Sequence, residues 1–275
     1  MTPLRALVVV LAGFAGGAMT AVVGAGSLAS LPVLLAIGLD PVTANVTSAV
    51  GVVPGSAAGV FAYRHQLPGL RRLLVPMLLP TVLGGAFGAL LLLVLPASTF
   101  ATLLPVLLVL AAVLVAVQPR IARAVASRQA ARTPAAEPAA VPTEDDDPGA
   151  APTAAEGGPT AGPVVLALGV LVAVYGGYFG AAVSVVYLAM LGSIVGGLQA
   201  SNGAKNTLTG LSCGAACVVF VLRAHPDWAA VALLAVGSTA GGLLAGRYGQ
   251  RLPDSALRVA LVVIALVTAA VEAVR

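Results

Sequence analysis

Charged residues are scarce in this sequence of 275 residues: Asp, Glu, Lys and Arg make up 9% of it, against about 25% in ordinary soluble domains. The mean hydropathy is +1.04, and 59% of the residues are hydrophobic. This composition excludes an ordinary soluble domain. The isoelectric point near 9.5 does not indicate nucleic-acid binding, because most arginines flank apolar stretches, where they set membrane topology.

Cysteine, histidine and intramembrane acids are also scarce. Cys213 and Cys217 share one apolar stretch without a neighbouring His or acid, so we expect them to pack rather than to bind a metal or form a disulfide. His65 and His225 lie in loops next to apolar stretches. No Asp or Glu falls in the middle of an apolar stretch, although cation transporters and proton pumps usually need buried carboxylates. The sequence therefore predicts no enzyme, no metal and no cofactor.

Apolar stretches of about 20 residues, long enough to cross a bilayer, dominate the rest. They predict an all-α integral membrane protein with about eight transmembrane helices, at residues 4–23, 42–63, 73–95, 98–117, 164–180, 204–222, 228–246 and 255–274. Two shorter apolar pieces, residues 27–38 and 183–198, each follow a glycine-rich break. Each is either the second half of a broken helix or one arm of a re-entrant hairpin.

The chain reads as a duplication. Residues 119–162 are rich in Ala, Pro and Thr and hold six of the ten acids, which predicts a disordered linker between a first repeat, 1–118, and a second, 163–275. "LDPVTANVTSAVGVVPGSAAGVFAYRH" (39–65) aligns with "LQASNGAKNTLTGLSCGAACVVFVLRAH" (198–225), and "TVLGGAFG" (81–88) with "STAGGLLAG" (238–246). Two four-segment repeats are typical of transporters, whose substrate site lies where the repeats meet.

Two topologies remain open. If all eight segments span and the N-terminus is cytoplasmic, ten Lys and Arg fall inside and four outside, and the repeats are parallel. If the first segment of each repeat is a hairpin and the N-terminus is external, eleven fall inside and three outside, and the repeats are inverted. The distribution of Lys and Arg does not distinguish the two topologies, and we favour the one with eight spans. Both place the linker in the cytoplasm, with the protein in the plasma membrane.

The glycine-rich breaks are the first candidate site. In "GFAGGAMTAVVGAGS" (13–27), Gly24 and Gly26 precede Pro32, a pattern that favours unwound backbone. Free N–H groups and the partial positive charge of a half-helix would face an anion there. The outer glycines also suit close helix packing. Symmetry predicts that the breaks of the two repeats lie close together.

The second candidate site consists of two clusters of short polar side chains, near the start of segments 42–63 and 204–222. The first contains Thr43, Asn45, Thr47 and Ser48, and the second Ser201, Asn202, Lys205, Asn206 and Thr207. Capping by Thr43 or Asn202 accounts for one member of each cluster, and the others suit an oxyanion. Lys205 is the only lysine of the chain and is either an interfacial lysine or the charge partner of a substrate. We predict binding by Lys205, Asn202, Asn206, Asn45, Thr47, Ser48, Gly24 and Gly26.

These motifs together resemble the TauE/SafE sulfite exporter family. The resemblance is carried by "GAGSLASLP" (24–32), "TANVTS" (43–48), "VYGGYFGAA" (174–182) and "NGAKN" (202–206). It implies a secondary transporter that exports a small anion, sulfite or an organosulfonate. The alternatives are an anion channel and a membrane protein without transport activity, such as an assembly factor. The expected partners are the anion and the lipid bilayer, with no nucleic acid, and a homo-oligomer is left open.

Overall fold

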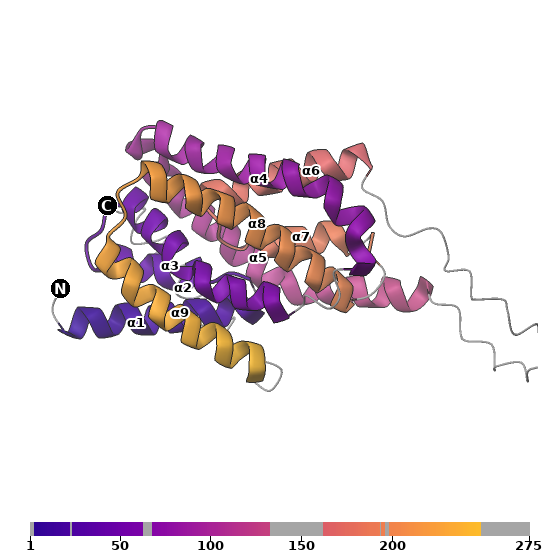
Figure 1. The fold of residues 1–275 in the computed structure, drawn as a ribbon, viewed down its shortest axis with the longest axis horizontal. Helices are drawn as coiled ribbons and strands as arrows, with labels where there is room; N and C mark the ends of the chain where they lie inside the picture. The colour runs from indigo at the N-terminus through magenta and orange to yellow at the C-terminus, as the bar shows by residue number, and fades with distance from the viewer. Residues whose placement is uncertain are drawn as a thin grey trace, which may run out of the picture.

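The computed structural model describes residues 3–22, 24–62, 68–132, 162–192, 194–195 and 198–248 (Figure 1). In this part the elements are α1 (Pro3–Val22), α2 (Ser27–Ala36), α3 (Pro41–Ala62), the 3-10 turn η2 (Pro68–Leu70), α4 (Arg71–Val94), α5 (Ala97–Arg132), α6 (Pro163–Tyr178), α7 (Val183–Leu191), α8 (Leu198–Arg223) and α9 (Trp228–Tyr248). Five of these helices, α1, α4, α5, α8 and α9, are long and apolar enough to cross a membrane. The described part is all-helical, as predicted, and the predicted span at 255–274 lies outside it.

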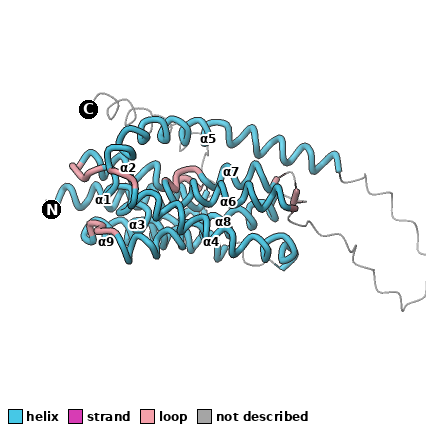
Figure 2. The backbone as a smooth tube through the Cα atoms, turned by 90° about the horizontal axis from the view of Figure 1, so that it is seen from above, coloured by secondary structure: helices cyan, strands magenta, loops and turns pink. Residues whose placement is uncertain are grey.

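α5 is longer than the sequence suggested. It has 36 residues, about 54 Å at 1.5 Å per residue, and lies along one side of the other helices (Figure 2). It includes residues 119–132, which the sequence assigned to the linker. The helix continues past Pro119 because its apolar face still has a partner there: Val125 is buried and lies against Gly192, directly after α7. Residues 133–161 of the predicted linker lie outside the described residues.

α1 runs parallel to α9, although the two helices come from opposite halves of the chain. A Cβ on Gly13 would overlap the backbone of Leu234, and a Cβ on Gly17 would overlap the backbone of Ser238. Between the first contact and the second, the residue number rises by four in both helices, so the two helices run in the same direction. Glycine is needed at Gly17 because the two backbones touch, and such close approach is common between helices in a membrane.

α3 also runs parallel to α9, because Gly51 and Gly55 lie against the same two residues of α9. Gly17 of α1 is therefore level with Gly55 of α3. Pro3 precedes Gly17 by as many residues as Pro41 precedes Gly55, about 21 Å of helix, so α1 and α3 start at the same level. The chain must travel back between them, and α2 does so. α1 and α2 form a hairpin that starts and ends at the same end of the bundle.

α4 and α6 make the corresponding contact in the other part of the molecule. Met77 lies against Gly169, and Gly85 lies against Gly177, so these two helices are also parallel. Their backbones touch at the second contact, where a Cβ on Gly177 would overlap the carbonyl group of Gly85. This contact explains the glycine-rich stretches of both helices as packing surfaces.

α6 and α7 form a second hairpin. Val183, at the start of α7, lies against Gly176 near the end of α6. Tyr187, one turn later, donates a hydrogen bond of 3.4 Å to the carbonyl group of Gly169, nearer the start of α6. The order of contacts is reversed, so α7 runs back along α6. The predicted continuous spans at 4–23 and 164–180 are thus each the first arm of a hairpin.

Contacts between the helices come in two matching sets. α1 and α3 pack on α9, while α6 and α8 pack on α4. In the sequence alignment α1, α3 and α4 correspond to α6, α8 and α9, so each contact has its counterpart. Figure 1 shows the start of α1 and the turn between α8 and α9 at one end, called the N-terminal end below. The end of α5 and the start of α6 lie at the other, called the linker end.

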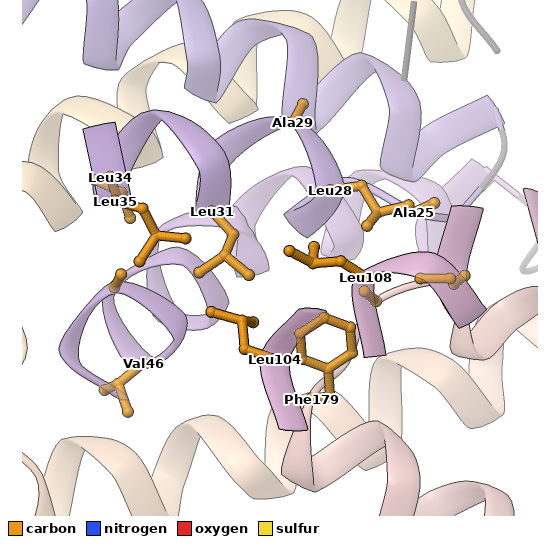
Figure 3. Close-up of a cluster of buried hydrophobic side chains, with 14 of the residues drawn as sticks. Ala25, Leu28, Ala29, Leu31, Leu34, Leu35, Val46, Leu104, Leu108 and Phe179 are labelled. Atoms are coloured by element: carbon orange, nitrogen blue, oxygen red, sulfur yellow. The ribbon is translucent and has the colours of Figure 1, made fainter. Parts of the chain in front are cut away.

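The short helix α2 is buried along most of its length. Leu28, Leu31, Leu34 and Leu35 are at most 3% exposed. Figure 3 shows them beside Val46 of α3, Leu104 and Leu108 of α5, and Phe179. This covering is what a non-spanning arm requires, because irregular backbone at membrane depth is tolerated only where protein surrounds it or it lines a cavity.

Asp40, rather than Thr43, caps the start of α3, and Asp227 caps the start of α9, while Asn202 lies inside α8, which starts at Leu198. Asp40 accepts a 2.9 Å hydrogen bond from the N–H of Thr43 at the start of α3. Asp227 accepts bonds of 3.0 and 3.1 Å from the N–H groups of Ala229 and Ala230 at the start of α9. A carboxylate at this position satisfies free N–H groups and the helix dipole. The polar cluster of α3 is therefore not explained by capping.

Candidate functional site

The two glycine-rich breaks share one turn, at Gly24 and at Gly180. Gly24 and Gly180 both have φ +77°, in the left-handed region that favours glycine. The N–H of Gly24 donates to the carbonyl of Met19, and the N–H of Gly180 donates to the carbonyl of Tyr175, each five residues back. Each hairpin therefore begins its turn in the same way, but the breaks differ two residues later, where Gly26 has φ −63° and Ala182 has φ +58°.

The two breaks meet, as predicted. The hydroxyl of Ser184, near the start of α7, donates a 2.9 Å hydrogen bond to the carbonyl of Gly24. A Cβ on Gly24 would overlap this serine side chain. The tips of the two hairpins thus touch in the interior of the bundle.

A cavity of about 50 Å³ lies beside this contact. The lining comes from α1, α3, α6 and α8, from both breaks and from the first residue of α2. It consists of Thr20, Gly24, Gly26, Ser27, Asn45, Ala49, Val52, Val53, Ser56, Gly176, Gly177, Phe179, Gly180, Thr209, Cys213, Ala216 and Phe220. No charged side chain occurs among these lining residues. Both halves of the chain contribute, which is the location expected for a substrate site in a duplicated transporter.

Asn45 is the most constrained polar side chain of the lining. It is 2% exposed, and its amide nitrogen donates a 3.2 Å hydrogen bond to the carbonyl of Tyr178. Its Oδ1 has no hydrogen-bond partner among the described residues. A buried acceptor without a partner is costly, so a group inside the cavity is the natural partner for this oxygen.

Thr209 supplies a second polar atom that lacks a partner. Its buried Oγ1 makes no hydrogen bond within the part of the chain that the structure describes. The other lining hydroxyls of α1 and α3 differ, because Thr20 donates to the carbonyl of Gly16 at 2.8 Å and Ser56 to that of Val52 at 3.3 Å. The hydroxyl of Thr209 is therefore ready to donate to a bound molecule.

Three of the eight predicted binding residues line the cavity: Gly24, Gly26 and Asn45. Thr47 and Ser48 are buried elsewhere on α3 and hold neighbouring elements together. The hydroxyl of Thr47 accepts a 3.1 Å hydrogen bond from the N–H of Asp227, and the hydroxyls of Ser48 and Ser30 are 2.6 Å apart. These two side chains fix α3 against α2 and against the start of α9.

Lys205, Asn202 and Asn206 are not among the lining residues. Lys205 is 4% exposed and lies well inside α8, which starts at Leu198. The prediction that it lies at the head of its helix is therefore wrong. It precedes Thr209 by four residues, so it lies on the same face of α8, one turn nearer the linker end.

Sequence reasoning missed Thr209, Thr20 and Ser56 because single hydroxyls in apolar helices are common. A usable signal existed for Thr209, which follows Lys205 by one helical turn on the same face. Cys213 continues that face by another turn and also lines the cavity. Within the described ranges no group of three or more His, Cys, Asp or Glu is placed to hold a metal ion.

Comparison with models of protein families gives a match. A sequence model of the family described as "Sulfite exporter TauE/SafE" matches residues 9–271, nearly the whole chain. None of the curated proteins and none of the solved structures compared with the chain matches it. The matched region contains both glycine breaks and every residue that lines the cavity.

Proposed function

Because the chain belongs to the sulfite exporter TauE/SafE family, we propose that it is a secondary transporter that exports a small sulfur oxyanion, sulfite or an organosulfonate, across the plasma membrane. The observation that carries this proposal is the cavity beside the contact between the two hairpin breaks, which has hydroxyl and amide side chains among its lining residues. Hydroxyl and amide groups can bind an oxyanion by directed hydrogen bonds. The protein acts by binding and moving its substrate and not as an enzyme.

The size of the cavity favours a compact anion. About 50 Å³ corresponds to roughly three to five water positions. Sulfite, with four heavy atoms, is of this size, whereas an organosulfonate with an amino-alkyl tail is larger. Sulfite is therefore the favoured substrate of the pair.

An inverted pair of repeats supports alternating access. The two hairpins enter the bundle from opposite ends, and each first arm packs on the third long helix of the other repeat. This arrangement corresponds to the topology with eleven Lys and Arg inside, an external N-terminus and a cytoplasmic linker end. Rocking of one repeat against the other would open the cavity to either side in turn.

Lys205 is proposed to guide the anion toward the cavity. α8 starts near the linker end, and helical side chains lean toward the start of their helix. Lys205, with Asn202 about one turn before it and Asn206 directly after it in the sequence, therefore lies between the cytoplasm and the cavity. The membrane potential then favours export of an anion from a cell that is negative inside, by about 2.3 kcal/mol per charge per 100 mV.

Flux of labelled sulfite from proteoliposomes tests the proposed function. A transporter gives efflux that saturates with internal sulfite and speeds up when unlabelled sulfite is added outside. A channel gives flux without this acceleration. Absence of sulfite and organosulfonate flux from vesicles that contain correctly folded protein would contradict the proposal.

A further inference from the structure

The amide group of Asn45 has a fixed orientation. The partner of its amide nitrogen is a backbone carbonyl, which can only accept a hydrogen bond. If the amide were flipped, Oδ1 would face the carbonyl oxygen of Tyr178 and two acceptors would repel each other. Oδ1 of this lining residue is therefore held as an acceptor, and it can be satisfied only by a donor.

A molecule bound in the cavity therefore needs both a hydrogen-bond donor and a hydrogen-bond acceptor. Oδ1 of Asn45 needs a hydrogen-bond donor, while the hydroxyl of Thr209 can give a hydrogen to an acceptor. A fully deprotonated oxyanion has only acceptors and would place negative charge against Oδ1. An oxyanion that keeps one hydrogen on oxygen can satisfy both side chains.

Charge gives the same result independently. The described lining contains no charged side chain, and the nearest cation along α8 is Lys205, one turn from Thr209. A monoanion brings one negative charge into this site of low polarity and a dianion brings two, which is far more strongly disfavoured.

We propose that the cavity selects the singly charged, protonated form of its oxyanion, of which hydrogen sulfite is the example, with Asn45 accepting from its O–H group and Thr209 donating to a bare oxygen. This inference rests on the proposed function and adds the charge state of the substrate. The proton joins sulfite in the cytoplasm and leaves it outside, so it crosses with the anion. Each cycle then moves one negative charge, and the carrier needs no carboxylate of its own.

The test is the affinity of the purified full-length protein for three probe anions, measured by calorimetry below and above the second ionisation of sulfite. Sulfite changes from monoanion to dianion over this range. Methanesulfonate is a monoanion without an acidic hydrogen, and sulfate is a dianion throughout. Cys213 in the lining, Cys217, Tyr175 and Tyr178 beside it, and Lys205 are titratable groups near the cavity among the described residues. Methanesulfonate reports any effect of their titration, because its own charge does not change.

We expect the apparent sulfite affinity to fall about tenfold per pH unit above that ionisation, because only the protonated fraction binds. Methanesulfonate should bind about tenfold more weakly than hydrogen sulfite at all pH values, and sulfate more weakly still. The variant Asn45→Leu should lower the affinity for hydrogen sulfite more than the affinity for methanesulfonate, because only hydrogen sulfite can donate to Oδ1, whereas loss of the bond to Tyr178 affects both anions.

Sulfite affinity that is constant or rises with pH would overturn the inference while leaving the proposed function in place. Equal affinity of the wild-type protein for methanesulfonate and hydrogen sulfite would do the same. These two results need no variant, so they decide the matter even if Asn45→Leu does not fold. If none of the three anions binds, both the inference and the proposed function would be overturned.

Discussion

The hydroxyl of Ser184 donates a hydrogen bond of 2.9 Å to the carbonyl of Gly24, and this contact joins the hairpin of one half of the chain to that of the other. Gly24 has φ +77°, and a Cβ there would overlap the Ser184 side chain. Gly24→Ala should therefore add a steric clash to the backbone cost of about 1–2 kcal/mol. The measurement is the thermal stability of purified variants.

Gly38→Ala is the matched control. Gly38 also has positive φ, +100°, but nothing lies within 4 Å of a Cβ placed on it. Gly38→Ala should lower stability only by the cost of the positive φ, and so by less than Gly24→Ala does. Adding Ser184→Gly to Gly24→Ala should recover part of the loss, relative to Ser184→Gly alone. Equal losses for the two alanine variants, without recovery, would show that the hairpin tips do not touch as described.

The hairpin topology predicts which side of the membrane the start of α1 faces. Leu4 is 72% exposed, so Leu4→Cys should be tolerated in a background with Cys213 and Cys217 replaced by alanine. An impermeant maleimide should label it on intact cells. Ala97→Cys should also be labelled from outside and Gly69→Cys only after permeabilisation, since both topologies agree on these positions. Labelling of Leu4→Cys only after permeabilisation would support eight full spans instead.

Removal of the Lys205 charge should weaken anion binding. At about 6–8 Å and an effective dielectric constant near 20, a buried charge contributes about 2 kcal/mol to an anion, or roughly thirtyfold in affinity. Lys205→Gln should lose this, and Lys205→Arg should lose less because the charge remains. Arg223→Gln, at the far exposed end of α8, is the control and should bind normally. Wild-type sulfite affinity in Lys205→Gln would identify the lysine as a structural residue.

The end of α5 and the acidic segment that follows should respond differently to replacement. Val125 packs against Gly192, so a Gly/Ser replacement of residues 119–132 removes a buried contact and should lower thermal stability. Replacement of residues 137–156, which contain no core-forming pattern, should leave stability and sulfite flux unchanged. Loss of flux at normal membrane abundance in the second replacement would give the acidic segment a regulatory role.

The sequence predicted the helices well and their directions poorly. Apolar length and glycine breaks located α1 to α9 within a few residues, apart from the ends of α5, α7 and α8. A hairpin arm and a full span contain the same kind of residues, so hydropathy does not distinguish them. Direction became visible only through long-range contacts, such as those of Gly13 and Gly17 with α9.

The polar clusters were only partly informative about the site. Successive residues of a helix point about 100° apart, so Asn45 reaches the cavity while Thr47 is used at the turn before α9. Lys205 was placed at a helix start because the polar residues before it lower the hydropathy. Those residues form the first turns of α8 instead. Hydropathy marks the apolar part of a helix and not its ends.

The most direct test of the central claim compares two threonines of the same helix. Thr209 has a buried hydroxyl at the cavity without a described partner, whereas the hydroxyl of Thr207, away from the cavity, donates to the carbonyl of Gly203 at 2.9 Å. Thr→Val keeps the shape and removes the hydroxyl at either position. By titration calorimetry, Thr209→Val should bind sulfite about ten- to a hundredfold more weakly, the value of a hydrogen bond to a charged group, and Thr207→Val should match the wild type. Wild-type affinity in Thr209→Val, or an equal loss in both variants, would contradict the claim that the anion binds in the cavity between the two hairpins.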